Sequence, residues 1–140
     1  MRKLLMVLSL LIGVNTFGDG FKIGLGGYCP VGFVKAGKQV FGSPQFASEY
    51  NGTTYYNSSP EAKAMFDKEP NVYVNAIKYV GYCATGVSMG KKLESDPSHF
   101  SQSGGNVYFF SSKEAKAMFD KEPAKFIAKA DVEWTKLSKK

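Results

Sequence analysis

The side chains with the clearest chemical potential are the sulfur and imidazole groups of the chain. Its 140 residues include two cysteines and one histidine, Cys29, Cys83 and His99. A closed structural zinc site needs four ligands, so this set fits zinc poorly. Copper(I) accepts two or three soft ligands, and Met89 lies outside the helix faces expected to be buried. The candidate metal ligands are therefore Cys29, Cys83, His99 and Met89, and copper is the metal that they favour.

Two other methionines and the histidine have simpler interpretations. Met65 and Met118 have the spacing of an apolar helix face, which predicts core packing rather than coordination. His99 lies in the segment 96–100, which the sequence predicts as a turn with a solvated imidazole. Copper binding thus depends on the fold bringing the four candidate ligands together.

An internal repeat dominates the sequence and determines how these residues are positioned. Residues 61–70 recur without change as residues 114–123, at an offset of 53. The tripeptide Gly-Tyr-Cys at residues 27–29 returns at residues 81–83, at an offset of 54. Because two copies are too few for a stacked array, we expect a pseudo-symmetric pair that shares one core.

The repeat places the two cysteines at equivalent positions, which favours a disulfide between them. A bond between Cys29 and Cys83 would close a loop of about 54 residues and contribute about 4 kcal/mol in the chain-entropy account. This pairing requires that the two cysteine segments meet near the pseudo-axis. The alternative is a pair of reduced, buried thiols that pack as small apolar side chains.

Local signals predict a β-hairpin and short helices in each copy, and hence an α+β fold. Asn51-Gly52 and Gly104-Gly105 separate β-favouring segments, as in tight hairpins. A serine pair then offers a helix N-cap, and the prolines Pro70 and Pro123 end the first helix and precede a second.

The N-terminus has the layout of a secretory signal peptide. A basic start is followed by the apolar run 4–14 and a small, polar exit at 15–18. The run is too short to span a bilayer, so we expect export to the periplasm or the exterior without stable membrane insertion. The predicted organisation is a signal peptide (1–18), a flexible lead-in (19–26), a first repeat (27–79), a second repeat (80–136) and a tail (137–140).

Composition and motifs argue against several classes of function. The net charge of +6 falls to about +4 without the signal peptide, and the lysines are spread along helices, so no nucleic-acid partner is expected. The sequence has no Cys-x-x-Cys pair, no Gly-x-Ser-x-Gly elbow and no complete nucleotide fingerprint, which argues against an enzyme. A transition-metal ion or an unknown protein remains as the expected partner.

Over residues 27–130 the chain resembles two copies of the YHS domain, one after the other. Each copy has paired aromatics, a serine pair, a Phe, a Pro and a final aromatic: Tyr55-Tyr56, Ser58-Ser59, Phe66, Pro70 and Tyr73, then Tyr108-Phe109, Ser111-Ser112, Phe119, Pro123 and Phe126. The segments Gly81-Tyr82-Cys83-Ala84 and Ala130-Asp131, with Trp134, are similar to the second half of secreted bacterial YHS-like proteins.

The resemblance implies a small metal-associated module, but the usual ligands are replaced. Ser58 and Ala62 stand at the two Cys positions of the family motif in the first copy, and Ser111 and Ala115 in the second. We therefore predict an exported, non-enzymatic YHS-like binding module that handles a soft metal such as copper. The alternative is a structural or protein-interaction domain that has lost the family metal site.

Overall fold

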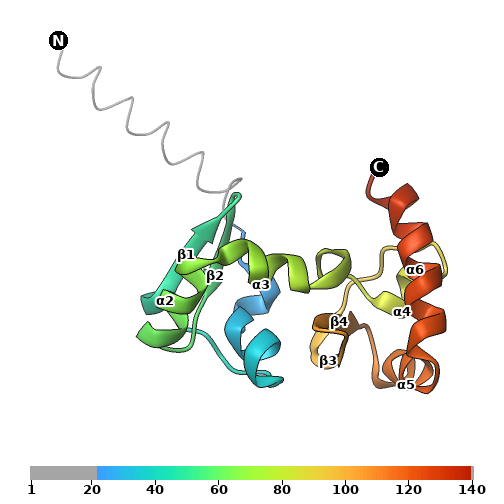
Figure 1. Cartoon of the computed structure of the whole chain (residues 1–140), viewed down its shortest axis with the longest axis horizontal. Helices are drawn as coiled ribbons and strands as arrows, with labels where there is room; N and C mark the ends of the chain where they lie inside the picture. Colours follow the sequence, from blue (N-terminus) through green and yellow to red (C-terminus); the bar gives the residue numbers. More distant parts are fainter. Residues whose placement is uncertain (1–21, 140) are drawn as a thin grey trace, which may run out of the picture.

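Each copy of the repeat folds into a β-hairpin followed by two helices, which confirms the predicted α+β fold (Figure 1). The computed structural model describes residues 22–139, so the predicted signal peptide lies outside the described residues. The first copy contains β1 (Ala47–Tyr50), β2 (Thr53–Tyr56), α2 (Pro60–Lys68) and α3 (Pro70–Ala76). The second contains α4 (Ala84–Ser88), β3 (Asp96–Ser103), β4 (Asn106–Phe110), α5 (Lys113–Lys121) and α6 (Pro123–Leu137).

Both hairpins are antiparallel and turn where the sequence predicts. Tyr50 pairs with Thr53 across Asn51-Gly52, whose φ angles are +50° and +80°. In the second hairpin Ser103 pairs with Asn106 across two glycines of positive φ. These dipeptides tolerate the left-handed backbone that a two-residue turn requires.

The serine caps and the prolines set the ends of the helices as expected. The Ser59 hydroxyl accepts a 3.0 Å hydrogen bond from the Ala62 amide, and Ser112 accepts one of 3.1 Å from Ala115. Each helix ends two residues before a proline, and the chain restarts as α3 or α6 with that proline in the first turn. Proline suits a first helical turn because the amide it lacks has no partner there.

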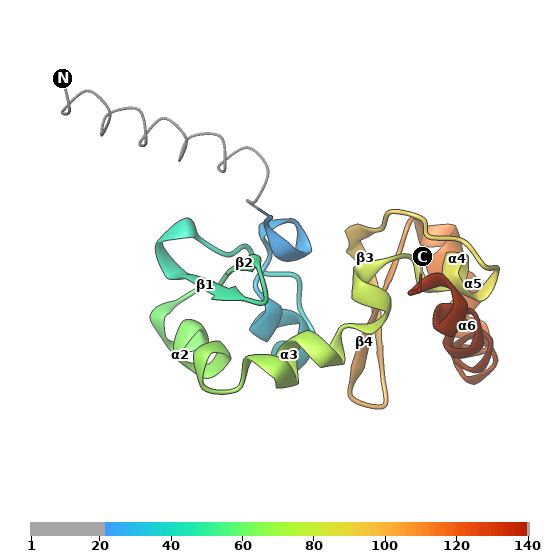
Figure 2. The ribbon, with the colours of Figure 1, turned by 90° about the horizontal axis from the view of Figure 1, so that it is seen from above.

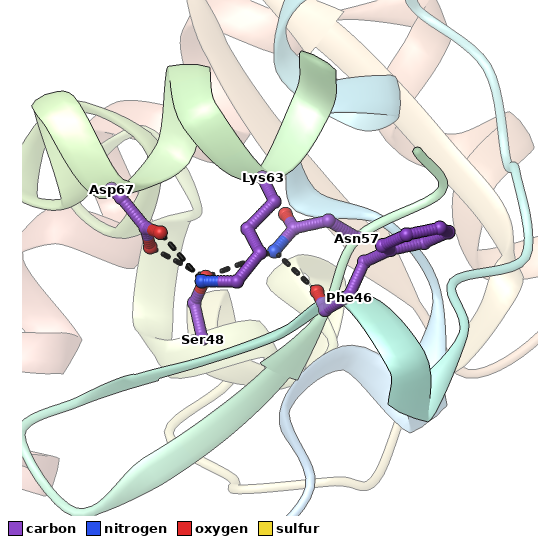
Figure 3. Close-up of polar contacts among 5 residues, drawn as sticks. All are labelled: Phe46, Ser48, Asn57, Lys63 and Asp67. Carbon is purple, nitrogen blue, oxygen red and sulfur yellow. Dashed lines mark hydrogen bonds and ion pairs between the residues drawn. The ribbon is translucent and has the colours of Figure 1, made fainter. Parts of the chain in front are cut away.

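A polar network joins α2 to its hairpin (Figure 3). Lys63 and Asp67 form an ion pair of 2.6 Å, and the Ser48 hydroxyl on β1 donates a 2.5 Å hydrogen bond to Asp67. The second copy repeats this arrangement with Lys116, Asp120 and Ser101. The identical stretch thus makes the same contacts in both copies.

The first copy adds a buried amide to its network. Asn57 is fully buried, and its Nδ2 donates to the Phe46 carbonyl (3.0 Å) and to Ser48 Oγ (3.1 Å) (Figure 3). Its Oδ1 is buried without a hydrogen-bond partner within the described part of the chain. The second copy has Phe110 at the corresponding position, also fully buried.

The core differs from the single shared core that the repeat predicted. Cys29, Phe66 and Tyr73 belong to a cluster inside the first copy, and a larger cluster fills the second. A third cluster, formed by Phe33, Ile77, Val107 and Phe109, joins the copies. Figures 1 and 2 show the two copies side by side, connected through the end of α3. Each copy therefore buries its own apolar face, and a separate aromatic contact holds the two together.

Two local predictions are wrong. Met65 and Met118 are 42% and 46% exposed, because Ala62 and Phe66, and Phe119 in the second copy, supply the buried helix face instead. The segment around His99 is part of β3 rather than a turn, since β4 provides a pairing partner. Within the predicted lead-in, Ile23 forms a bridge to Thr54. No helix within residues 22–139 has the length and apolar character needed to cross a membrane.

Candidate functional site

The predicted disulfide between Cys29 and Cys83 is wrong. Cys29 is fully buried in the core of the first copy, Cys83 is 1% exposed in the core of the second, and both thiols are free and too far apart to bond. Because each cysteine segment packs inside its own copy, no axis brings the two together. The structure matches the alternative of two buried thiols that serve as small apolar side chains.

The four predicted metal ligands are not assembled into one site. His99 lies on β3, with its Nε2 3.8 Å from Asp96, while Met89 is 54% exposed after the end of α4. The two thiols are buried in separate cores. Across residues 22–139, no three His, Cys, Asp or Glu side chains are grouped so that they could hold a metal ion. The geometry thus lends no support to copper binding by these residues.

A groove between the two copies offers a better candidate site. It has a volume of about 590 Å³ and continues into a smaller hollow of about 290 Å³ that shares five lining residues with it. Both copies contribute to the walls of the larger part, which are formed by Lys22, Ile23, Gly24, Leu25, Thr53, Tyr55, Val74, Asn75, Ile77, Lys78, Tyr79, Val80, Gly81, Tyr82, Glu94, Asp131 and Trp134.

Two left-handed turns line this groove, one from each copy. The turn η1 (Gly24–Gly27) has Leu25 at φ +56°, and η4 (Lys78–Gly81) has Tyr79 and Val80 at +57° and +53°. Side chains with a Cβ rarely adopt this conformation, and each such residue costs about 1–3 kcal/mol. Val80 is β-branched and 79% exposed, so burial of its own side chain does not offset the strain.

The strands fix the position of both turns. Ile23, just before η1, forms a parallel bridge to Thr54 on β2, and Ile77, just before η4, forms the corresponding bridge to Val107 on β4. After each turn the chain continues into a Tyr-Cys pair, in which the tyrosine is half-buried and the cysteine is buried. The turns are therefore fixed by a strand bridge before them and by a buried cysteine after them. Ile77 and Tyr28 also pack in the cluster that joins the copies, and this packing holds the strained conformation in place.

The wall on the second copy is aromatic. Trp134 on α6 lies between Tyr79 and Tyr82, with ring centroids 5.8 and 6.2 Å away. The Tyr79 hydroxyl donates a 2.7 Å hydrogen bond to Asp131 Oδ1. Burial, together with the hydrogen bond to the Asp131 carboxylate and its charge, raises the pKa of Tyr79 far above its usual value. Tyr79 therefore stays protonated and holds Asp131 at the edge of the groove.

The sequence did not single out this site. Tyr79, Val80 and Trp134 look like ordinary core residues, because neither Tyr nor Val is a typical residue of a left-handed turn. One signal was available. The repeated Gly-Tyr-Cys aligns Tyr79 and Val80 with Leu25 and Gly26, and Gly26 stands in a glycine-rich stretch that indicates a turn.

Comparisons of the chain with protein-family models, with curated proteins and with solved structures give no match. The resemblance to YHS domains therefore rests on the residues quoted for it and stays a prediction.

Proposed function

We propose that this protein is an exported, non-enzymatic binding module that takes a small ligand into the groove between its two YHS-like copies. The observation that carries the proposal is the pair of left-handed turns at the groove walls, with Tyr79 and Val80 in a strained backbone conformation. Strain of this kind collects at ligand sites, where the surrounding structure holds it for function. Aromatic faces with a few polar groups at the walls are typical of ligand sites.

The groups at the walls favour recognition over chemistry. Among residues 22–139, the groove and its extension are lined by no cysteine or histidine and by one serine, Ser95, which donates its hydroxyl proton to the Gly81 carbonyl. Burial and the hydrogen bond to Asp131 raise the pKa of Tyr79 and keep its hydroxyl neutral. A nucleophile next to a general base, the usual pair in covalent catalysis, is not among these wall residues.

The competing function is a structural or protein-interaction domain that has lost the family metal site. The replacements Ser58, Ala62, Ser111 and Ala115 fit that alternative equally well. If this alternative is right, the groove results only from how the copies meet, and small molecules do not bind there specifically. Copper handling remains a prediction from the family resemblance, without a matching arrangement of ligands.

Amide chemical shifts during a fragment screen test the binding proposal. We expect fragments that combine an aromatic ring with a charge to shift the Trp134 indole and the Gly24 and Gly81 amides. Asn75→Phe should abolish these shifts, because Asn75 is an exposed groove residue on α3 and a ring there fills the space. Asn71→Phe is the matched control, since Asn71 is exposed one turn earlier on α3, outside the groove.

The outcomes of this screen are distinct. Shifts that persist in Asn75→Phe would place the ligand elsewhere, and a screen in which no fragment shifts the groove residues would favour the interaction-domain alternative. Export is tested separately by the intact mass of protein from cell fractions. A chain that begins near Asp19 outside the cytoplasm supports it, and a cytosolic chain that begins at Met1 contradicts it.

A further inference from the structure

The aromatic wall of the groove already attracts cations from its own chain. Lys92 is not among the residues that line the groove, and its ammonium lies 5.7 Å from the Tyr82 ring centroid and 5.8 Å from that of Trp134. Lys78 Nζ lies 6.0 Å from the Tyr79 centroid. A cation within about 6 Å of a ring face is attracted by the negative face of the ring. All three rings of the wall therefore have a lysine ammonium at that distance.

Two carboxylates reinforce this preference. Glu94 and Asp131 both line the groove, and neither belongs to an ion pair within residues 22–139. Asp131 accepts the neutral Tyr79 hydroxyl, so its negative charge is not compensated by a cation. Two lysines line the groove as well: Lys22, from the chain segment before η1, and Lys78, in η4.

We propose that the ligand of the groove is a small organic cation of the quaternary ammonium type, which displaces the Lys92 side chain from the faces of Tyr82 and Trp134. Aromatic rings with nearby carboxylates are the usual means of binding such cations, because a quaternary ammonium sheds its weakly held water easily. Lys92 is exposed and can return to solvent when the ligand enters. This inference rests on the proposed binding function and names the ligand class.

Trp134 is the only tryptophan of the chain, so its fluorescence reports on this site directly. The probes are choline and its neutral isostere 3,3-dimethylbutan-1-ol, with sodium chloride added to match ionic strength. We expect choline to change the Trp134 emission saturably and to bind at least about fivefold more tightly than the isostere. Equal affinities would overturn the cation assignment while leaving a functional groove.

Substitutions at Lys92 test the displacement. Lys92→Ala should tighten choline binding about two- to fivefold, because the competing ammonium is gone. Lys91→Ala removes the same charge from the neighbouring exposed position and should leave the affinity nearly unchanged. Glu94→Gln should weaken choline binding without affecting the isostere. An unchanged affinity in Lys92→Ala would overturn the displacement.

The two proposals fail in different ways. If neutral or anionic fragments shift the groove amides and choline does not, the ligand class is wrong and the binding function stands. If neither choline nor any fragment affects the groove residues, both proposals are wrong.

Discussion

The Tyr79 hydroxyl and Asp131 Oδ1 lie 2.7 Å apart and join the strained turn before the second copy to the last helix of the chain. Both residues line the groove. The hydrogen bond connects Tyr79, which has a positive φ in η4, to the exposed carboxylate of Asp131 on α6. The conformation of the turn and the position of α6 therefore depend on each other.

Tyr79→Phe keeps the ring and removes only this bond. We expect a loss of about 1.5–3 kcal/mol in the free energy of unfolding, as for a hydrogen bond to a charged group. Tyr82→Phe is the control in the same wall and should have a smaller effect. Urea unfolding measures both, and equal losses in the two variants would contradict a special role for the bond to Asp131.

The pH dependence of stability provides a second readout of Tyr79, whose pKa is raised by burial and by the bond to Asp131. Because the pKa of Tyr79 is raised in the folded chain, its contribution is complete below the unfolded value of about 10 and is lost as the pH rises toward the folded value. Stability should therefore fall above pH ~10 in the parent, and Tyr79→Phe should show a shallower fall. Parallel profiles would show that Tyr79 does not titrate with unfolding.

Val80 and Gly26 occupy corresponding positions in the two left-handed turns, at φ +53° and +63°. Val80→Gly should stabilise the fold by about 1 kcal/mol, since it removes strain and an exposed side chain. Gly26→Val should destabilise it by a similar amount. Thermal unfolding of both variants checks this opposition. A loss of stability in Val80→Gly would show that the valine side chain contributes contacts.

Asn57 lends itself to an unusual substitution. Asn57→Leu should leave stability unchanged or raise it by about 1 kcal/mol, because the unpartnered Oδ1 is removed with the amide. The Phe46 carbonyl keeps its bond from the Asn57 backbone amide, and the Ser48 hydroxyl still donates to Asp67. Asn57→Asp places a carboxylate in the same space and should cost at least about 2 kcal/mol. Chemical denaturation distinguishes the two.

The paired aspartates predict a loss of stability in acid. Burial alone would raise the pKa of Asp67 and of Asp120, but hydrogen bonds from Lys63 and Ser48, or from Lys116 and Ser101, lower it. Their contribution is complete above the unfolded pKa of about 3.9 and is lost as the pH falls through the lower, folded value.

The double variant Asp67→Asn, Asp120→Asn should therefore be less stable at neutral pH and lose less stability between pH ~5 and ~2. Glu61→Gln, together with Glu114→Gln, removes one carboxylate from each of the same helices and serves as the control. Stability curves by urea unfolding across this range test the idea. A steep acid transition that persists in the aspartate variant would assign it to other groups.

The two thiols give a direct check of the cysteine arrangement. Both should react with a thiol reagent only after unfolding, without prior reduction, because Cys29 and Cys83 are buried and unpaired. The measurement is the mass of the labelled protein. If the unlabelled protein has a mass two hydrogens lower and incorporates no label, Cys29 and Cys83 form a disulfide after all.

Local features were predictable from the sequence and long-range ones were not. Asn51-Gly52, the Ser59 cap and Pro70 act on their immediate neighbours, so the hairpin and the helices follow from them. The environment of His99 depends on pairing between β3 and β4, which the residues around it do not reveal. The cysteine prediction assumed a common axis, whereas each cysteine is buried in the core of its own copy. The groove depends on how the copies meet.

The way the two copies meet also limits how many can be joined. Phe33 of the first copy packs edge-on against Phe109 of the second, at 4.9 Å between centroids. The residue that corresponds to Phe33 in the second copy, Val87, is fully buried in a cluster with Ala130 of α6. Helix α6 thus occupies the surface through which a third copy would dock, and it terminates a head-to-tail arrangement that could otherwise continue into open-ended fibres.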